Sequence, residues 1–346
     1  MSKVQKKKRK KKTSSLYKFL LFLEILIIAV FILIGLTIKC ISNVSTTPLD
    51  ESQLVTVNED INMENYTNIV LFGVDTRSTD LSSEASRSDA IIVASINNNT
   101  KEVKLISIYR DSYVSVNGTY TKINHAYAYG GPELAISTIN RNYDLNISQY
   151  ATVNFKIMAN IIDALGGIEL EVEADFIDDL NKYIKSVNYY NGGNSPGFTS
   201  AGTYTFDGNQ AVAYARIRHN QNGDISRANR QRIVLKAIMD KAKTHPVTFM
   251  KAMNDVLPQI QTNMTTNDLM KMVFSAPLYK IVDQEGFPYD HTEVRLSDGI
   301  YYDVPTTLEE NVIKLHENLF GTINYQISDE LNRINEKIMS QTGYYQ

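Results

Sequence analysis

The sequence predicts an α/β protein in which one folded body follows a single membrane-spanning helix. Residues 68–74, 89–96 and 101–108 are rich in β-branched residues and are typical of buried strands. Helical periodicity recurs through the rest of the body, and a mostly apolar run lies near the N-terminus. The predicted helices are 132–142, 150–164, 207–216, 226–243, 247–260, 266–280, 306–320 and 326–340.

The N-terminal apolar run, residues 19–38, predicts a membrane anchor, because a helix of this length is about 30 Å long and matches the hydrocarbon core of a bilayer. Basic residues 6–12 precede it, so the N-terminus is expected in the cytoplasm and the C-terminal body outside the cell. No small-residue cleavage site follows, which favours a retained anchor over a cleaved signal peptide. The expected organisation is a cytoplasmic tail (1–18), the span (19–38), a stalk (39–65) and one body (66–346).

Charge is divided sharply along the chain. Residues 1–40 hold ten of the 35 Lys and Arg residues and one of the 38 acidic residues, which leaves 25 basic and 37 acidic residues beyond. An acidic body is a poor nucleic-acid binder, because affinity for a duplex comes from phosphate neutralisation over a wide surface. Cys40 is the single cysteine, so an intrachain disulfide and a cysteine metal cluster are excluded.

Charged residues stand at the ends of the three predicted strands. If the second strand runs antiparallel to its neighbours, all of these charges meet at one edge of the sheet, which is how a sheet presents a site. The six residues are Asp75, Arg77, Arg87, Asp89, Arg110 and Asp111. Downstream, residues 121–131 are expected to form a loop before a helix at Pro132, and residues 186–203 a long loop.

A second group of charges lies between residues 216 and 232, which contain five of the eleven arginines found after residue 40. Ser226 is expected to cap a helix, and the spacing of Arg227, Arg230 and Gln231 places them on one helical face. Arg216 and Arg218 would share a face if that segment is extended. Clustered guanidinium groups need an anionic partner, and their fork geometry suits phosphate. The alternative is a solvated basic helix paired with local carboxylates.

Asp75 and Asp89 are candidate ligands for Mg²⁺, with Mn²⁺ as a second possibility, because the hard carboxylate oxygens suit these ions. For either aspartate alone, an ordinary salt bridge or turn cap is the simpler interpretation. Lys122 could contact phosphate or be solvated, and His125 is more typical of a structural histidine than of a base. The sequence contains no phosphate-binding Walker A loop, His-Glu-x-x-His motif or Gly-x-Ser-x-Gly elbow.

Six ordered motifs resemble those of the LytR-CpsA-Psr family. They include Asn68-Ile-Val-Leu-Phe-Gly-Val-Asp-Thr-Arg77, Arg87-Ser-Asp-Ala-Ile91 and Ser107-Ile-Tyr-Arg-Asp111. The other three lie at 122–131, 163–167 and 216–231, so the resemblance covers roughly residues 66–243. Tyr109 stands where the family usually has proline. The region after residue 245 resembles nothing that assigns it a role.

The resemblance implies a twisted mixed central sheet flanked by helices, with an apolar channel for a lipid tail. It implies an extracytoplasmic phosphotransferase of Gram-positive bacteria that moves an undecaprenyl-pyrophosphate-linked glycopolymer, such as teichoic acid or capsular polysaccharide, onto peptidoglycan. Asp75 and Asp89 would hold Mg²⁺, and Asp75, Asp89 and Arg110 would be catalytic. The residues expected to bind pyrophosphate are Arg87, Arg110, Lys122, Arg216, Arg218, Arg227, Arg230 and Gln231. An aspartate near the metal is expected to be the base.

Two alternatives share these residues. A membrane-tethered regulator could bind lipid-linked pyrophosphate without turnover, and it would need the arginines but not both aspartates. A pyrophosphatase would use the same site with water as the acceptor, and the sequence does not separate hydrolysis from transfer. The polymer, the oligomeric state and the role of residues 245–346 stay open.

Overall fold

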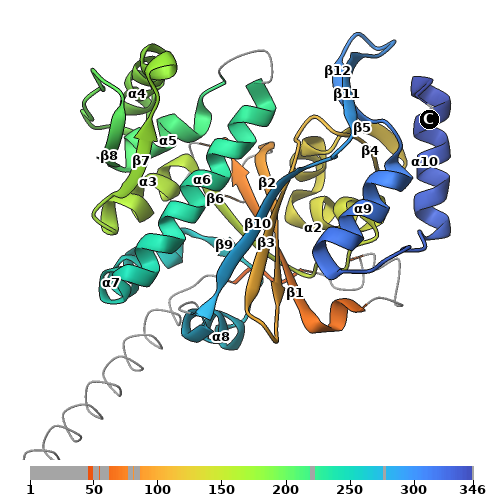
Figure 1. Ribbon diagram of the computed structural model, residues 1–346, viewed down its shortest axis with the longest axis horizontal. Coiled ribbons are helices and arrows are strands. Elements are labelled where there is room, and N and C mark those ends of the chain that lie inside the picture. Colours follow the sequence, from red (N-terminus) through yellow and green to blue (C-terminus); the bar gives the residue numbers. More distant parts are fainter. Residues whose placement is uncertain are drawn as a thin grey trace, which may run out of the picture.

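A six-stranded mixed sheet forms the centre of the molecule, with helices on both faces (Figure 1). The computed structural model describes residues 46–49, 54, 62–76, 81, 86–218, 223–275 and 278–344. The strand order is β10-β3-β2-β1-β6-β9. The strands are β1 (Tyr66–Val74), β2 (Ser88–Asn97), β3 (Glu102–Ile108), β6 (Gln149–Asn154), β9 (Gln261–Thr262) and β10 (Lys280–Phe287).

Strand pairing confirms the antiparallel arrangement expected for the first three strands. β2 pairs antiparallel with both β1 and β3, whereas β6 is parallel to β1 and β10 is parallel to β3. The C-terminal ends of β1, β3, β6 and β10 therefore meet the N-terminal end of β2 at one edge of the sheet. We call this edge the charged edge.

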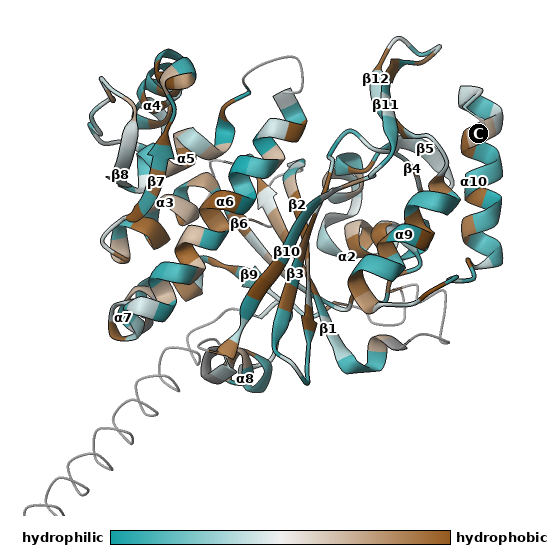
Figure 2. Ribbon diagram, viewed as in Figure 1, coloured by the Kyte–Doolittle hydropathy of each residue, from teal (hydrophilic) through white to brown (hydrophobic). Residues whose placement is uncertain are grey.

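The two faces of the sheet pack into separate cores because side chains alternate along each strand. Val70 and Phe72 of β1 face a large core with helices α2 (Asn124–Tyr143), α9 (Leu308–Phe320) and α10 (Asp329–Thr342). Ile69 belongs to a smaller core on the opposite face, with α6 (Gly223–Thr244) and α8 (Thr266–Ser275) nearby. Figure 2 shows hydrophobic residues concentrated along the central strands.

A third core lies beside the sheet and is built by consecutive elements. It joins α3 (Phe155–Ala164), β7 (Ile168–Val172), α4 (Ile177–Asn191), β8 (Gly202–Phe206) and α5 (Gly208–Arg216). A capping box of Asp207 and Gln210 starts α5, so each side chain satisfies an otherwise unpaired backbone N–H group. The helix α7 (Pro246–Val256) continues from α6 below this unit in Figure 1.

Several predicted boundaries are wrong. Residues 149–154 form β6, because alternate residues are buried there, and the helix starts only after Asn154 caps it. The expected long loop at 186–203 is shorter, since α4 continues to Asn191 around buried Val187. The helix predicted over 266–280 ends at Ser275, and the strand β10 follows from Lys280. The helix α2 begins at Asn124 and kinks at Gly130 and Gly131, before Pro132.

Two hairpins were missed from the sequence. β4 (Tyr113–Val116) pairs with β5 (Thr119–Lys122), and β11 (His291–Arg295) pairs with β12 (Tyr301–Pro305). The predicted span at 19–38 lies outside the described residues. Among the helices that are described, none is long and apolar enough to cross a membrane.

Candidate functional site

The charged edge brings together the residues predicted to flank the strands. Asp75 follows β1, Arg87 precedes β2, and Arg110 and Asp111 follow β3. Asp89 lies in the second position of β2. The strand topology therefore confirms the predicted gathering for five of the six charges, and Arg77 lies outside the described residues.

A β-bulge places Asp89 at this edge. Gly73 pairs with Ala90 and Val74 pairs with Ser88, so Asp89 is the extra residue of β2. The strands approach closely here, since a Cβ on Gly73 would lie 2.9 Å from the Cβ of Ala90. A bulge bends the strand and redirects the extra side chain, which is a frequent device beside active sites.

Arg110 links Asp89 to the other carboxylates. Its Nη1 donates to Asp89 Oδ1 at 2.7 Å, and its Nη2 lies 3.5 Å from Asp224 Oδ2. Its Nε lies 3.8 Å from Asp111 Oδ1. Although burial opposes the charge, the carboxylates raise the pKa of Arg110, with Asp89 contributing most among them. The guanidinium is therefore held in place and charged.

Asp224 also joins several arginines of this cluster, although no role was predicted for it from the sequence. It lies in the first turn of α6. Its Oδ1 lies 3.2 Å from Nη2 of Arg227 and 3.5 Å from Nε of Arg218. One carboxylate thus contacts three arginines, counting Arg110. The only signal in the sequence was an acid at the start of an arginine-rich helix.

The predicted helix cap at Ser226 is wrong. The helix α6 already begins at Gly223, and Ser226 Oγ instead accepts a hydrogen bond from Nη1 of Arg230 at 2.9 Å. The same nitrogen donates to the backbone oxygen of Ile217 at 3.2 Å. Arg230 also stacks on Phe176, 5.2 Å from the ring centre, so it points toward the third core.

Arg227 points the other way, into the charged edge. It is only 6% exposed, and its Nη2 donates to the backbone oxygen of Asp89 at 3.2 Å. Burial, followed by the charge of Arg110, lowers its pKa to about 10, so it stays protonated at neutral pH. Within the described structure, its buried Nε has no hydrogen-bond acceptor. A buried guanidinium with an unused donor fits an anionic ligand.

The other predicted phosphate-binding residues surround this centre at different depths. Lys122 Nζ lies 3.1 Å from Asp111 Oδ1, and Arg87 is exposed. The pKa of His125 is lowered by burial first, and then by the charges of Arg87 and Lys122. Arg216 stacks 4.8 Å from the ring centre of Phe155. Arg216 and Arg218 therefore do not share one partner, and Arg216 and Arg230 lie on the side of the third core.

Asp75 and Asp89 have the donor chemistry that a magnesium site needs. Both lie at the end of the β1–β2 pair, and their carboxylate oxygens are suitable donors. Asp75 is exposed, while Asp89 uses one oxygen for Arg110. The described residues contain no group of three His, Cys, Asp or Glu side chains that could hold a metal. Mg²⁺ usually keeps several waters and adds substrate phosphate oxygens to one or two carboxylates, so a pair of aspartates agrees with its usual coordination.

An apolar cavity of about 250 Å³ adjoins the charged edge. Strands β1, β2 and β6 form one wall, and helices α3 and α6 form the other. The lining includes Leu71, Ile92, Ala151, Val153, Phe155, Met158, Val234, Leu235 and Ile238. Asp89 and Gln231 line this cavity and also the small hollow that contains Arg110, Arg227 and Asp224. The apolar cavity therefore lies next to the hollow that contains Arg110 and Arg227.

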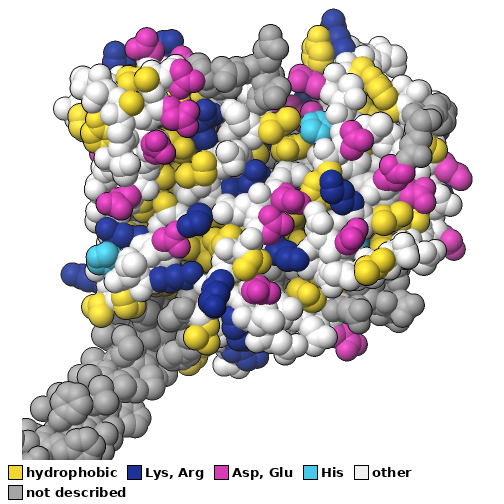
Figure 3. All heavy atoms as spheres, in the orientation of Figure 1, with side chains coloured by type: hydrophobic (Ala, Val, Ile, Leu, Met, Phe, Trp, Pro, Cys, Tyr) yellow, Lys and Arg dark blue, Asp and Glu magenta, His cyan; other side chains and the backbone are white. Residues whose placement is uncertain are grey.

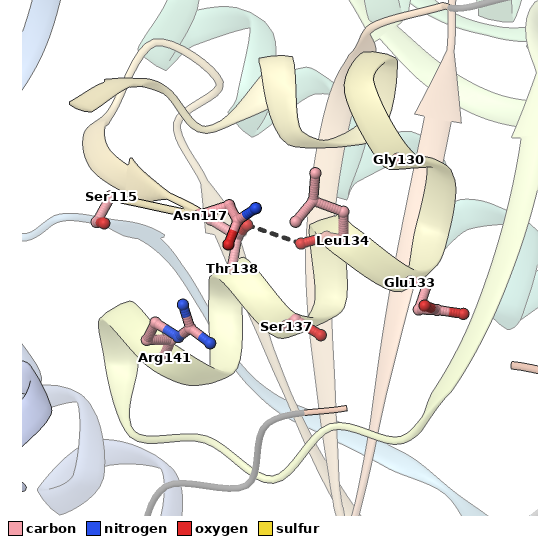
Figure 4. A pocket seen from close by; sticks show the side chains of 8 residues that line it. All are labelled: Ser115, Asn117, Gly130, Glu133, Leu134, Ser137, Thr138 and Arg141. Carbon is pink, nitrogen blue, oxygen red and sulfur yellow. Dashed lines mark hydrogen bonds between the residues drawn. The ribbon is translucent and has the colours of Figure 1, made fainter. Parts of the chain in front are cut away.

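Another cavity lies away from the charged edge, between the β4–β5 hairpin and the kinked α2 (Figure 4). Polar residues such as Ser115, Asn117 and Glu133 line it, and Thr138 Oγ1 donates to the backbone oxygen of Leu134 at 2.7 Å. None of the predicted site residues lines this cavity. On the face shown in Figure 3, basic and acidic side chains are interspersed.

Comparisons with known proteins give a consistent result. The LytR_cpsA_psr family model matches residues 35–318. The polyisoprenyl-teichoic acid–peptidoglycan teichoic acid transferase TagU of Bacillus cereus (strain AH820) is 30% identical over 271 residues, 76% of this chain and 82% of that protein. The crystal structure of B. subtilis TagT, at 25% identity, has a TM-score of 0.60 and covers 80% of this chain and 100% of that one.

A structure of TagT with bound octaprenyl pyrophosphate lipid has a TM-score of 0.59 at 24% identity, and covers 80% of this chain and 100% of that chain. At this identity the likeness shows the fold alone. Together these structures confirm the expected mixed α/β architecture with a central sheet flanked by helices.

Proposed function

Since the chain belongs to the LytR_cpsA_psr family, we propose that it is a phosphotransferase that attaches a lipid-pyrophosphate-linked glycopolymer to peptidoglycan through a phosphodiester. The donor is an undecaprenyl-linked polymer, with teichoic acid as the first candidate because the TagU relative carries that activity in its name. The acceptor is a hydroxyl group of the peptidoglycan.

The observation that carries this proposal is that the apolar cavity lies next to the hollow that contains Arg110 and Arg227. A polyprenyl pyrophosphate is an apolar chain that ends in two phosphates, and Asp89 and Gln231 line both compartments. The prenyl chain would occupy the cavity, while Arg110, Arg218 and Arg227 would hold the pyrophosphate. The ligand would satisfy the buried Nε of Arg227.

The residues of the chain would stabilise the transition state mainly by electrostatic interactions. Guanidinium groups held near the phosphorus neutralise charge that develops on the phosphoryl oxygens, and preorganised charges cost no rearrangement. Arg110 is preorganised by Asp89 and Asp224, and Arg227 by Asp224 and the Asp89 carbonyl. Asp75 and Asp89 would hold Mg²⁺, which when bound supplies further charge neutralisation.

Anchoring in the cell membrane would place the site near its donor. The basic tail and the apolar run at 19–38 support a single-pass protein with its catalytic body outside the cell. Peptidoglycan and the lipid-linked polymer are the expected partners.

The test is a transfer assay with full-length protein in detergent. A synthetic polyprenyl-pyrophosphate-linked disaccharide, peptidoglycan fragments and Mg²⁺ would be supplied, and phosphodiester-linked product and released prenyl phosphate would be measured separately. We expect equal amounts of both. Prenyl phosphate without linked product would indicate hydrolysis, and tight donor binding without either product would indicate a regulator.

Asp75→Asn serves as the site variant in this assay. It removes the exposed carboxylate at the end of β1, and Glu336→Gln on the exposed side of α10 is the matched control. We expect the site variant to lose most transfer and the control to keep it. Equal transfer by Asp75→Asn and wild type would contradict the catalytic role of Asp75.

A further inference from the structure

A second cavity lies at the charged edge and shares none of the lining residues of the apolar cavity. Its volume is about 500 Å³, and its lining includes Asp111, Arg218, Asp224, His291, Glu293 and Asp303. Asp224 also lines the small hollow that contains Arg110 and Arg227, so this cavity adjoins the place proposed for the pyrophosphate. We call it the acidic cavity.

The C-terminal region builds one wall of the acidic cavity. Because β10 is parallel to β3, its end delivers the β11–β12 hairpin beside Arg110 and Asp111. Tyr109 N donates to the Phe287 carbonyl at 2.8 Å, and Asp303 N donates to the Asp111 carbonyl at 2.9 Å. These backbone bonds fix Asp303 against the strand end that carries Arg110.

The hairpin places like charges directly opposite one another. Glu293 on β11 pairs in register with Asp303 on β12. Cross-strand pairs of like charge destabilise a hairpin. The arrangement is costlier because Asp303 is 9% exposed and faces Asp111 as well. Local stability does not explain two carboxylates here, and such costs are typical of functional positions.

We propose that the acidic cavity binds the sugar acceptor and that Asp303 is the general base that takes the proton from its hydroxyl group. This assignment rests on the proposed transferase function and replaces the expectation that an aspartate at the metal is the base. It gives a role to the C-terminal region, for which the sequence offered none.

The chemical step balances with the groups present. The acceptor hydroxyl oxygen forms a bond to the phosphorus that carries the glycopolymer, and the bridging P–O bond of the pyrophosphate breaks. Prenyl phosphate leaves with the bond electrons. The hydroxyl proton passes to a carboxylate oxygen of Asp303, and solvent later removes it.

The environment of Asp303 suits a base at neutral pH. Burial, followed by the charges of Asp111, Glu293 and Asp224, raises its pKa to about 7, and Lys122 opposes this effect. Burial lowers the pKa of His291, whose Nε2 lies 4.0 Å from Asp303 Oδ1, so the ring is neutral and supplies no counter-charge. A base works best when its pKa lies near the working pH. The titratable and charged groups around Asp303 include Tyr109, Asp111, Lys122, Arg218, Asp224, His291, Glu293, Tyr301 and Tyr302.

The lining favours a sugar over a second phosphate group. Carboxylates accept hydrogen bonds from hydroxyl groups and repel phosphate. Tyr301 is 56% exposed at the rim, and an exposed aromatic ring offers an apolar face to a sugar ring. Donor and acceptor therefore have chemically different compartments, both next to the arginine cluster.

The test measures transfer rate against pH for full-length protein in detergent, with saturating donor and peptidoglycan fragments. We expect the wild-type rate to rise with pH and to level off above about 7. Asp303→Asn should lower the rate by about 10²–10⁴ and abolish this pH dependence. Glu293→Gln should move the rise to lower pH, because it removes a charge that raises the Asp303 pKa. Glu317→Gln, on the exposed side of α9, is the control that should match wild type.

Three outcomes separate the possibilities. Loss of the pH-dependent rise in Asp303→Asn, with a shifted rise in Glu293→Gln, would support the assignment. Transfer by Asp303→Asn with the wild-type rate and pH profile would overturn it and leave the transferase function intact. Absence of linked product from wild type at every pH would overturn the transferase function, and the base assignment with it. Thermal unfolding of each variant checks that it is folded.

Discussion

Nη1 of Arg110 lies 2.7 Å from Oδ1 of Asp89, so the second residue after β3 is tied to the bulged residue at the start of β2. This contact crosses the charged edge and fixes the orientation of the guanidinium. It also joins a residue expected to bind phosphate to a residue expected to bind the metal, so the position of each side chain depends on the other.

Replacing Arg110 with lysine should lower the transfer rate by about 10²–10³, because a single ammonium group cannot contact Asp89, Asp224 and a phosphate oxygen together. Initial rates of linked product formation would measure the effect. Arg333→Lys on the exposed part of α10 is the matched control and should change the rate less than about twofold. A rate near wild type for Arg110→Lys would show that only its charge is needed.

Asp224→Asn should destabilise the protein by about 1–2 kcal/mol, because buried Arg227 loses its carboxylate partner. The same variant should bind inorganic pyrophosphate more tightly, since three arginines are then less neutralised. Thermal unfolding with and without pyrophosphate tests both effects. A variant that is destabilised but gains no extra protection from pyrophosphate would show that these arginines do not bind the anion.

Strands that are stabilised by their own buried residues were predicted from the sequence, whereas strands that depend on a pairing partner were missed. β1, β2 and β3 are rich in β-branched residues and largely buried, so their own residues predict them. β10 carries polar residues at partly exposed positions and exists because β3 pairs with it. Strand formation of this kind depends on the partner, which local periodicity does not reveal.

The site residues were likewise predicted where they flank predicted strands, and missed where their position depends on tertiary contacts. An antiparallel order of the three predicted strands was enough to bring Asp89 and Arg110 to the same edge of the sheet. The junction at Asp224 depends on side-chain directions at the start of α6, which spacing alone does not specify. Asp303 lies almost two hundred residues beyond Arg110, and the pairing of β10 with β3 and the backbone bond from Asp303 to Asp111 bring it to the charged edge.

The apolar cavity should be necessary for a prenyl donor and irrelevant to pyrophosphate alone. Ala151→Phe would place a ring in the cavity from the partly exposed Ala151 of β6. We expect a clear rise in the KM for a long prenyl donor, with unchanged protection by inorganic pyrophosphate in thermal unfolding. Loss of both would indicate damage to the fold, and loss of neither would place the prenyl chain elsewhere.

The raised pKa of Asp303 also has a consequence for stability. The pKa of this carboxyl group is about 7 in the folded state and about 4 in the unfolded state. The resulting contribution to the stability of the folded state is fully present below a pH of about 4. That contribution is lost as the pH rises from about 4 to about 7, because only the unfolded state has then released the proton.

Asp303→Asn should therefore be more stable than wild type at pH 8 by roughly 2–4 kcal/mol, with the difference shrinking toward pH 5. Denaturant unfolding at several pH values would measure it, with Asp178→Asn, an exposed aspartate of α4, as the matched control. A variant that is stabler yet slower is the expected behaviour of a catalytic group held at a cost to the fold. A constant difference across pH would instead show that Asp303 stays ionised, and that it lacks the pKa a base at neutral pH needs.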